Sequence, residues 1–159
     1  MGTSCAIVRQ NKDGSLSMIT VHWDGQRNRA GKTLLDHYTD EAKLNDLFEL
    51  GDLSVLGPNP VSKPEWWDYL KPETEEQKEG CLAYADRGEF CPATRFRDSE
   101  EFLDDFPDYV NYVYFFKDNK WYIAEKIYYD TRDPINFGAK PYVKLTPLDL
   151  LIGSAITYK

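Results

Sequence analysis

The sequence predicts a single α+β domain over residues 1–159, with an antiparallel sheet built from two β-hairpins and helices packed on one face. Two pairs of apolar or aromatic strands are each joined by a short polar turn. The helical patterns lie between these pairs and do not alternate singly with strands, which argues against a parallel Rossmann-type sheet. With 159 residues and 42% hydrophobic residues, the chain can form a core without disulfide or metal support.

The first hairpin is expected from residues 4–10 and about 15–23. The turn between them ends in Asp13-Gly14, a pair that readily takes the positive φ values of a tight turn. Alternation divides the second strand into two faces. The core face carries Ile19, Val21 and Trp23, and the opposite face carries Met18, Thr20 and His22. We therefore expect Trp23 to pack inward, with His22 and Asp24 pointing together to the opposite side.

Two helices are expected next. The first covers 31–38, where Leu34, Leu35 and Tyr38 have helical spacing. The second begins at Thr39 as N-cap and ends at Gly51. A long, proline-rich connection follows over about 52–80, and its adjacent Trp66 and Trp67 form either a lid on the core or an exposed contact.

The second half supplies the other hairpin. A short strand near 81–84 precedes the charged turn 86–89, and Asp98 begins a helix that Pro107 ends. The second hairpin is expected from residues 109–116 and 121–129, which are joined by a turn at 117–120. A last strand over 142–145 and a short helix with Pro147 at its first position complete the prediction.

The composition limits the classes of partner. The net charge of -8 argues against direct binding to double-stranded DNA or to an anionic membrane, since both are polyanions. It suits solubility or a basic protein partner. Three cysteines without a C-x-x-C pair, and only two histidines, indicate neither a disulfide framework nor a zinc site, and we expect no cofactor. With no signal peptide or membrane span in the sequence, a cytoplasmic location is expected.

The corner at residues 22–25 (His-Trp-Asp-Gly) leads into a loop that carries Arg27, Arg29 and Lys32. A strand, a glycine loop and a helix beginning Gly-Lys-Thr are the context of a phosphate-binding loop. However, five residues separate Gly25 from Gly31 where that motif has four, which argues against nucleotide hydrolysis. A weaker version remains, in which the amides of residues 31–33 and the three basic side chains bind an anion.

His22, Asp24 and His37 could form a metal site or an acid–base pair. Alternatively, His37 caps the first helix and His22 bonds a turn carbonyl. Asp86 and Arg87 lie in the charged turn, where Arg87 either presents its guanidinium to an anion or makes a structural ion pair with Asp24. The sequence contains no serine in an elbow motif and no cysteine in an electropositive context.

Several motifs occur together in this order: His22-Trp23-Asp24-Gly25, Leu34-Leu35-Asp36-His37-Tyr38, the segment 50–57 (Leu-Gly-Asp-Leu-Ser-Val-Leu-Gly), the segment 85–89 (Ala-Asp-Arg-Gly-Glu) and the hairpin from Tyr112 to Trp121. Together they resemble a widespread family of small, uncharacterised bacteriophage and prophage proteins, over about residues 4–125. The resemblance implies a viral context and no particular activity. Family members often have an aromatic–proline pair where this chain has Gln26 and Arg27.

Three functions therefore remain open. The first is a non-enzymatic acidic binding protein, made during phage infection, that engages a host protein in the host cytoplasm to counter defence. The second is sequestration of an anionic nucleotide at the corner. The third is a metal-assisted hydrolase using His22, Asp24 and His37. The candidate binding residues are His22, Trp23, Asp24, Arg27, Arg29, Lys32, His37, Trp66, Trp67, Asp86 and Arg87.

Overall fold

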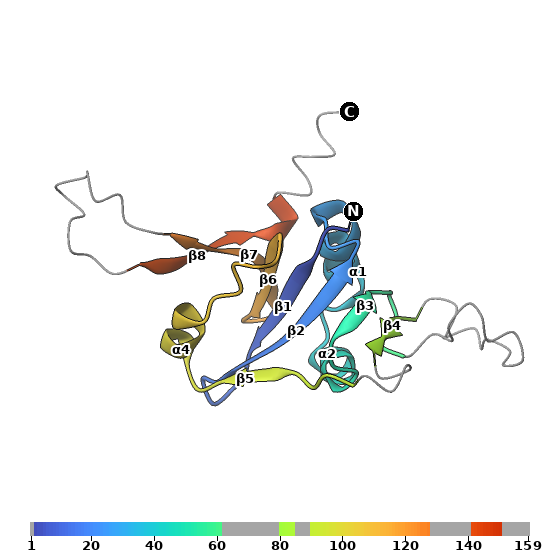
Figure 1. Cartoon of the computed structure of the whole chain (residues 1–159), viewed down its shortest axis with the longest axis horizontal. Helices are drawn as coiled ribbons and strands as arrows, with labels where there is room; N and C mark the ends of the chain where they lie inside the picture. The colour runs from blue at the N-terminus through green and yellow to red at the C-terminus, as the bar shows by residue number, and fades with distance from the viewer. Residues whose placement is uncertain (1, 62–79, 85–89, 128–140, 151–159) are drawn as a thin grey trace, which may run out of the picture.

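The computed structural model describes residues 2–61, 80–84, 90–127 and 141–150, in which a mixed sheet carries helices on both faces (Figure 1). The strands are β1 (Cys5–Gln10), β2 (Leu16–Trp23), β3 (Leu53–Val55), β4 (Leu82–Ala83), β5 (Thr94–Phe96), β6 (Tyr112–Lys117), β7 (Lys120–Ile127) and β8 (Tyr142–Pro147). The helical segments are the π-helical turn η1 (Arg27–Gly31), α1 (Lys32–His37), α2 (Glu41–Glu49) and α4 (Ser99–Asp104). None of the described helices is long and apolar enough to cross a membrane.

Both predicted hairpins are confirmed. β1 pairs antiparallel with β2, and Gly14 takes a φ of 88° in the turn between them. β6 pairs antiparallel with β7 around Asp118 and Asn119, whose φ values of 51° and 63° lie in the left-handed region. The two successive residues with positive φ match the right-handed twist of β6 and β7, whereas in the β1–β2 turn Gly14 is the one residue with positive φ.

The α+β class is confirmed, but the sheet is mixed. Its order is β4-β3-β2-β1-β6-β7-β8, with β5 also paired to β2. β1 runs parallel to β6 and β2 runs parallel to β3, so the expectation of a wholly antiparallel sheet is wrong. Helices α1 and α2 return the chain from the end of β2 to the start of β3, and such a crossover is what parallel pairing requires.

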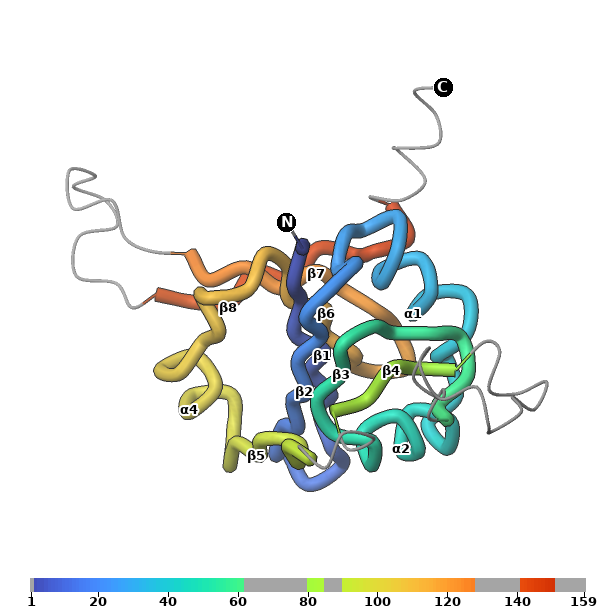
Figure 2. The backbone as a smooth tube through the Cα atoms, turned by 45° about the vertical axis from the view of Figure 1, so that its right-hand side comes forward, coloured from blue at the N-terminus to red at the C-terminus, as the bar shows by residue number. Residues whose placement is uncertain are grey.

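The expectation of helices on one face is also wrong. The face covered by η1, α1 and α2, here called the first face, has a core that includes Ile7, Ile19 and Tyr114. The opposite or second face carries α4 and a separate core that includes Val8, Met18 and Phe102. Figure 2 shows α4 on the side of the sheet away from α1 and α2. The central strands carry apolar side chains at successive positions, so both of their faces need cover.

The boundaries of several elements differ from the prediction. Asp40, not Thr39, caps α2, because its side chain accepts a hydrogen bond from the amide of Ala42. β6 begins only at Tyr112, and β8 extends through Pro147 before a short helical stretch at 148–150. The expected 52–80 connection contains the three-residue strand β3, and its residues 62–79 lie outside the described part of the chain.

Candidate functional site

The expected inward packing of Trp23 is wrong. Trp23 lies at the end of β2, two residues beyond the last pair with β1, and 42% of its surface is exposed. Its indole lies edge-on to the His22 imidazole, with ring centroids 4.8 Å apart. A Cβ on Gly2 would lie 2.0 Å from the indole ring, so the N-terminal backbone packs directly on Trp23.

Asp24 and Gly25 join the corner to the sheet. Asp24 takes a φ of 58°, which ends the strand alternation expected to place it beside His22. The amide of Gly25 donates to the Thr3 carbonyl at 2.8 Å, and its carbonyl accepts from the Tyr114 hydroxyl at 2.6 Å. A Cβ on Gly25 would lie 2.8 Å from the backbone of Ser4, so glycine is required here by close approach.

The loop after the corner does not form the expected anion cradle. The Gly31 amide donates to the Gln26 carbonyl, and the Lys32 amide donates to carbonyls of η1. Gly31 is buried against the ring of Tyr114. The Lys32 ammonium pairs with Asp36 at 2.8 Å, while Arg29 is exposed. The helical turn therefore already uses the amides of Gly31 and Lys32, which were expected to bind an anion.

The proposed metal or acid–base set is not assembled as a cluster. His22 lies at the end of β2, Asp24 in the corner and His37 at the end of α1, and all three are exposed. The residues that the structure describes include no group of three or more histidine, cysteine or acidic side chains that could hold a metal ion. The other candidates, Trp66, Trp67, Asp86 and Arg87, lie outside the described residues.

Arg27 lines a cavity of about 590 Å³ beside the end of the β6–β7 ladder, where pairing stops at Tyr114 and Ile123. Lys144 lines it too, but so do Asp108 and Glu125. Two basic and two acidic side chains give this cavity no net preference for an anion.

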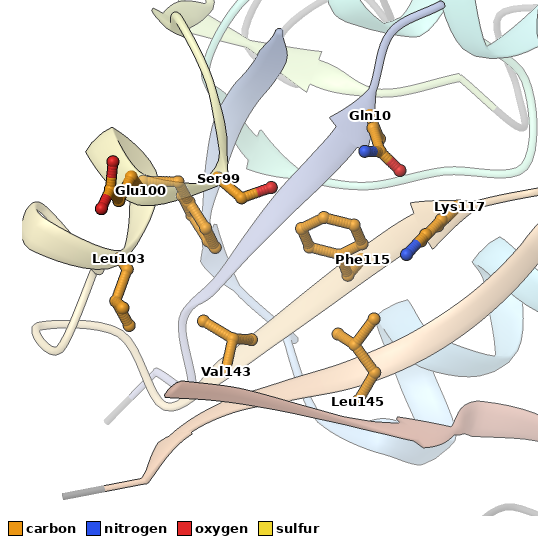
Figure 3. Close-up of a pocket in the computed structure, with 9 residues that line it drawn as sticks. Gln10, Ser99, Glu100, Leu103, Phe115, Lys117, Val143 and Leu145 are labelled. Atoms are coloured by element: carbon orange, nitrogen blue, oxygen red, sulfur yellow. The ribbon is translucent and has the colours of Figure 1, made fainter. Parts of the chain in front are cut away.

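The second face carries an open apolar groove, here called the α4–β8 groove. Its volume is about 340 Å³. Figure 3 shows Leu103 from α4 and Val143 and Leu145 from β8 gathered around Phe115 of β6. Alternation places Phe115, Val143 and Leu145 on the second face, and α4 supplies the other wall. The polar residues Gln10, Ser99, Glu100 and Lys117 also line it.

The wall formed by α4 is strongly acidic. Residues 98–108 contain six acidic side chains and no basic one, namely Asp98, Glu100, Glu101, Asp104, Asp105 and Asp108. Asp98 caps α4 by accepting from the Glu101 amide at 2.9 Å, and Arg97 pairs with the Glu101 carboxylate. The remaining acidic side chains of α4 give this part of the second face a negative potential.

A second cavity on the same face, here called the His22 cavity, has a volume of about 310 Å³. It is lined by Gly2, Ser4, Thr20, Val21, His22, Tyr84, Tyr109 and Val110. Thr20 and His22 are two residues apart on β2 and so point to the same side of the sheet. Gly2 and Ser4 precede β1, Tyr84 follows β4, and Tyr109 and Val110 precede β6, so with β2 four segments meet there.

Asp52 lies against the wall of the His22 cavity. Its carboxylate accepts a hydrogen bond from the Thr20 amide at 2.9 Å and is half-buried. Burial raises the pKa of Asp52, although the hydrogen bond from Thr20 opposes this rise. Burial also raises the pKa of Tyr109, and the nearby Asp52 charge adds to the effect. A partly buried carboxylate with a raised pKa beside a cavity is typical of functional sites.

Sequence reasoning did not find Asp52 or the groove. The segment 50–57 drew attention only as a motif of the resembled family, and its contact with Thr20 depends on the parallel pairing of β2 and β3. Comparisons with protein-family models, with curated proteins and with solved structures find no match for this chain.

Proposed function

We propose that this chain is a non-enzymatic binding protein that holds a basic protein partner on the second face of its sheet. The observation that carries the proposal is the α4–β8 groove, whose apolar floor adjoins the acidic helix α4. Of the charged residues nearby, Glu100 and Lys117 line the groove, and Glu101 and Asp104 lie on α4 beside it. This arrangement is complementary to a partner segment with apolar and basic side chains. The sequence adds no catalytic signature that would favour an enzyme.

The size of the groove indicates what it contributes to binding. A volume of about 340 Å³ accommodates one or two apolar side chains. Burying each fully would contribute about 1.5–3 kcal/mol. Association itself costs about 4–15 kcal/mol, so the groove acts as an anchor within a wider contact over the second face.

The acidic side chains of α4 contribute mainly to the rate and selectivity of association. Exposed charges of this kind steer a basic partner toward the surface, and the steering weakens as salt is added. Binding through this face is therefore expected to slow as ionic strength rises.

The resemblance to bacteriophage proteins supplies the biological setting of the proposal. On that basis the partner is a host protein, and binding serves to counter a host defence in the cytoplasm. The acidic, aromatic-rich composition supports a protein contact, because tyrosine, tryptophan and phenylalanine are enriched at the cores of interfaces.

The test compares two substitutions at adjacent positions on β8. Val143 lies in the groove, while Tyr142 is 56% exposed and points to the opposite side of the strand. Proteins captured from a bacterial lysate by the wild-type chain are identified, purified and measured for binding to Val143→Arg and Tyr142→Arg. The proposal expects Val143→Arg to weaken binding at least ~10-fold, which corresponds to ~1.4 kcal/mol, and Tyr142→Arg to leave it unchanged.

Circular dichroism is the check that both variants fold. Because Val143→Arg could disturb β8, Leu103→Arg introduces the same charge from the α4 wall of the groove. A captured protein that binds wild type and both groove variants equally would contradict the proposal, as would binding that is insensitive to salt.

A further inference from the structure

We propose that the His22 cavity is a binding site for an arginine side chain of the partner, whose guanidinium stacks on Tyr109 and is attracted by Asp52. The inference rests on the proposed function, because it assigns a basic residue of that partner to a second site. The α4–β8 groove by itself does not predict this second site.

The shape and lining of the cavity suit a flat cation. The volume of about 310 Å³ is open to solvent and has two tyrosines in its wall. Aromatic faces attract guanidinium groups through their quadrupole, and arginine stacks on them more often than lysine does. None of the lining residues that the structure describes is lysine or arginine.

Asp52 supplies the negative charge. Its carboxylate accepts from the Thr20 amide, and Thr20 is itself part of the cavity wall. Among the described residues, the ion pairs do not include Asp52. The neighbourhood therefore holds a half-buried carboxylate that an incoming cation would neutralise.

Asp13 provides a useful contrast. Its carboxylate accepts from the Ser15 hydroxyl and amide and pairs with Arg95, and these contacts lower the pKa of Asp13. Asp52 has the opposite shift, because burial raises its pKa. The buried negative charge of Asp52 therefore costs the folded chain free energy, and a bound cation would reduce that cost, as in a recognition site. Asp13 has the contacts of a structural residue.

The His22 cavity and the groove are lined by neighbouring stretches of the chain. Tyr109 and Val110 line the cavity, and Phe102 and Leu103 of the preceding helix α4 line the groove. The connection from α4 to β6 therefore links the two sites on the second face. A partner segment lying along this connection would place an apolar side chain in the groove and an arginine in the cavity.

The test uses N-acetylarginine amide as the probe and N-acetylcitrulline amide as its neutral isostere. Titration of the isotope-labelled full chain by NMR is expected to give saturable shifts at the amides of residues 20–22 and 109–110 with the arginine derivative. The citrulline derivative, which has the same shape without the charge, is expected to bind at least ~10-fold more weakly.

Three variants and a matched control identify the groups responsible. Asp52→Asn keeps an oxygen that can accept from the Thr20 amide and is expected to weaken the probe at least ~5-fold. Tyr109→Ala is expected to weaken it several-fold, whereas Tyr109→Phe retains the ring and most of the affinity. Asp46→Asn removes the same charge from an exposed position on α2 and is expected to have no effect.

Equal binding of the arginine and citrulline derivatives would overturn the inference, and so would equal weakening by Asp52→Asn and Asp46→Asn. The experiment is separable from that on the proposed function. Val143→Arg lies in the groove and is expected to leave the arginine probe unaffected. Loss of partner binding in groove variants without any response to the probe would support the groove and remove the arginine site.

Discussion

The Tyr114 hydroxyl donates a 2.6 Å hydrogen bond to the carbonyl oxygen of Gly25, which connects the central strand β6 to the corner at the end of β2. Both residues are buried, and the ring of Tyr114 also supports Gly31 at the end of η1. The corner at residues 22–25 therefore has a structural role, because it connects the sheet to the first helices.

Removal of this hydroxyl is expected to destabilise the fold. Tyr114→Phe leaves the buried Gly25 carbonyl without its phenolic donor, which costs about 1–3 kcal/mol. Chemical denaturation measures the change in the free energy of unfolding. Tyr122→Phe, at a half-buried position on β7, is the control and is expected to cost less. Equal losses of unfolding free energy in the two variants would argue against this structural role of the Tyr114 hydroxyl.

Alanine substitutions at two glycines are expected to differ in cost. In Gly25→Ala the new Cβ would lie 2.8 Å and 2.9 Å from backbone atoms of Ser4 and Cys5, so β1 must shift, at a cost of about 3 kcal/mol or more. In Gly14→Ala the Cβ meets open space, and only the φ of 88° is unfavourable, which costs about 1–2 kcal/mol. Thermal unfolding measures the loss of stability in both variants. A larger loss for Gly14→Ala than for Gly25→Ala would contradict the prediction.

Asp52 is expected to make stability depend on pH. Burial raises the pKa of Asp52 in the folded chain, so folding favours its protonated form. Its stabilising contribution is complete below the pKa of the unfolded chain and is lost as pH rises through the raised folded pKa. Asp52→Asn carries no charge and is therefore expected to be more stable than wild type at pH 7, with the advantage shrinking toward pH 4.

Denaturant unfolding of wild type and Asp52→Asn across this pH range measures the effect. Asp46→Asn, at an exposed position, serves as the reference for simple charge removal. A constant difference between wild type and Asp52→Asn at all pH values would contradict the assignment.

The cysteines are expected to differ in reactivity. Cys5 and Cys81 are buried, and burial raises the pKa of both thiols, whereas Cys91 is exposed. A disulfide reagent should therefore react quickly with Cys91 in the native chain and at least ~100-fold more slowly with the other two, which need an opening of the structure. Cys91→Ser should abolish the fast phase. Persistence of that phase in Cys91→Ser would show that a core cysteine is accessible.

Local sequence was sufficient for most of the elements. Asp13-Gly14 and Asp118-Asn119 favour tight turns by their own backbone preferences, and both hairpins form where these turns predict. The helix over 32–37 follows from the spacing of its apolar residues. These signals depend on neighbours within a few residues, which is why they can be read without the fold.

The residues of the candidate site were predicted from the sequence much less well than the helices and strands. His22 was expected to be a candidate and does line a cavity, but Tyr109 lines that cavity from another segment and Asp52 bonds the Thr20 amide beside it. Arg29 and Lys32 were expected to hold an anion, whereas the Lys32 ammonium pairs with Asp36. A motif shows which residues are near one another in the chain, and pockets depend on which segments pack together.

The sequence by itself determined the two hairpins, the helices and the acidic character of the chain, because turn preference, apolar periodicity and charge are properties of local composition. Only the tertiary structure decided that β1 lies parallel to β6, that α4 covers the second face, and that Leu103 and Val143 line one groove. Those contacts join residues far apart in the chain, and long-range packing selects them by burying both faces of the central strands.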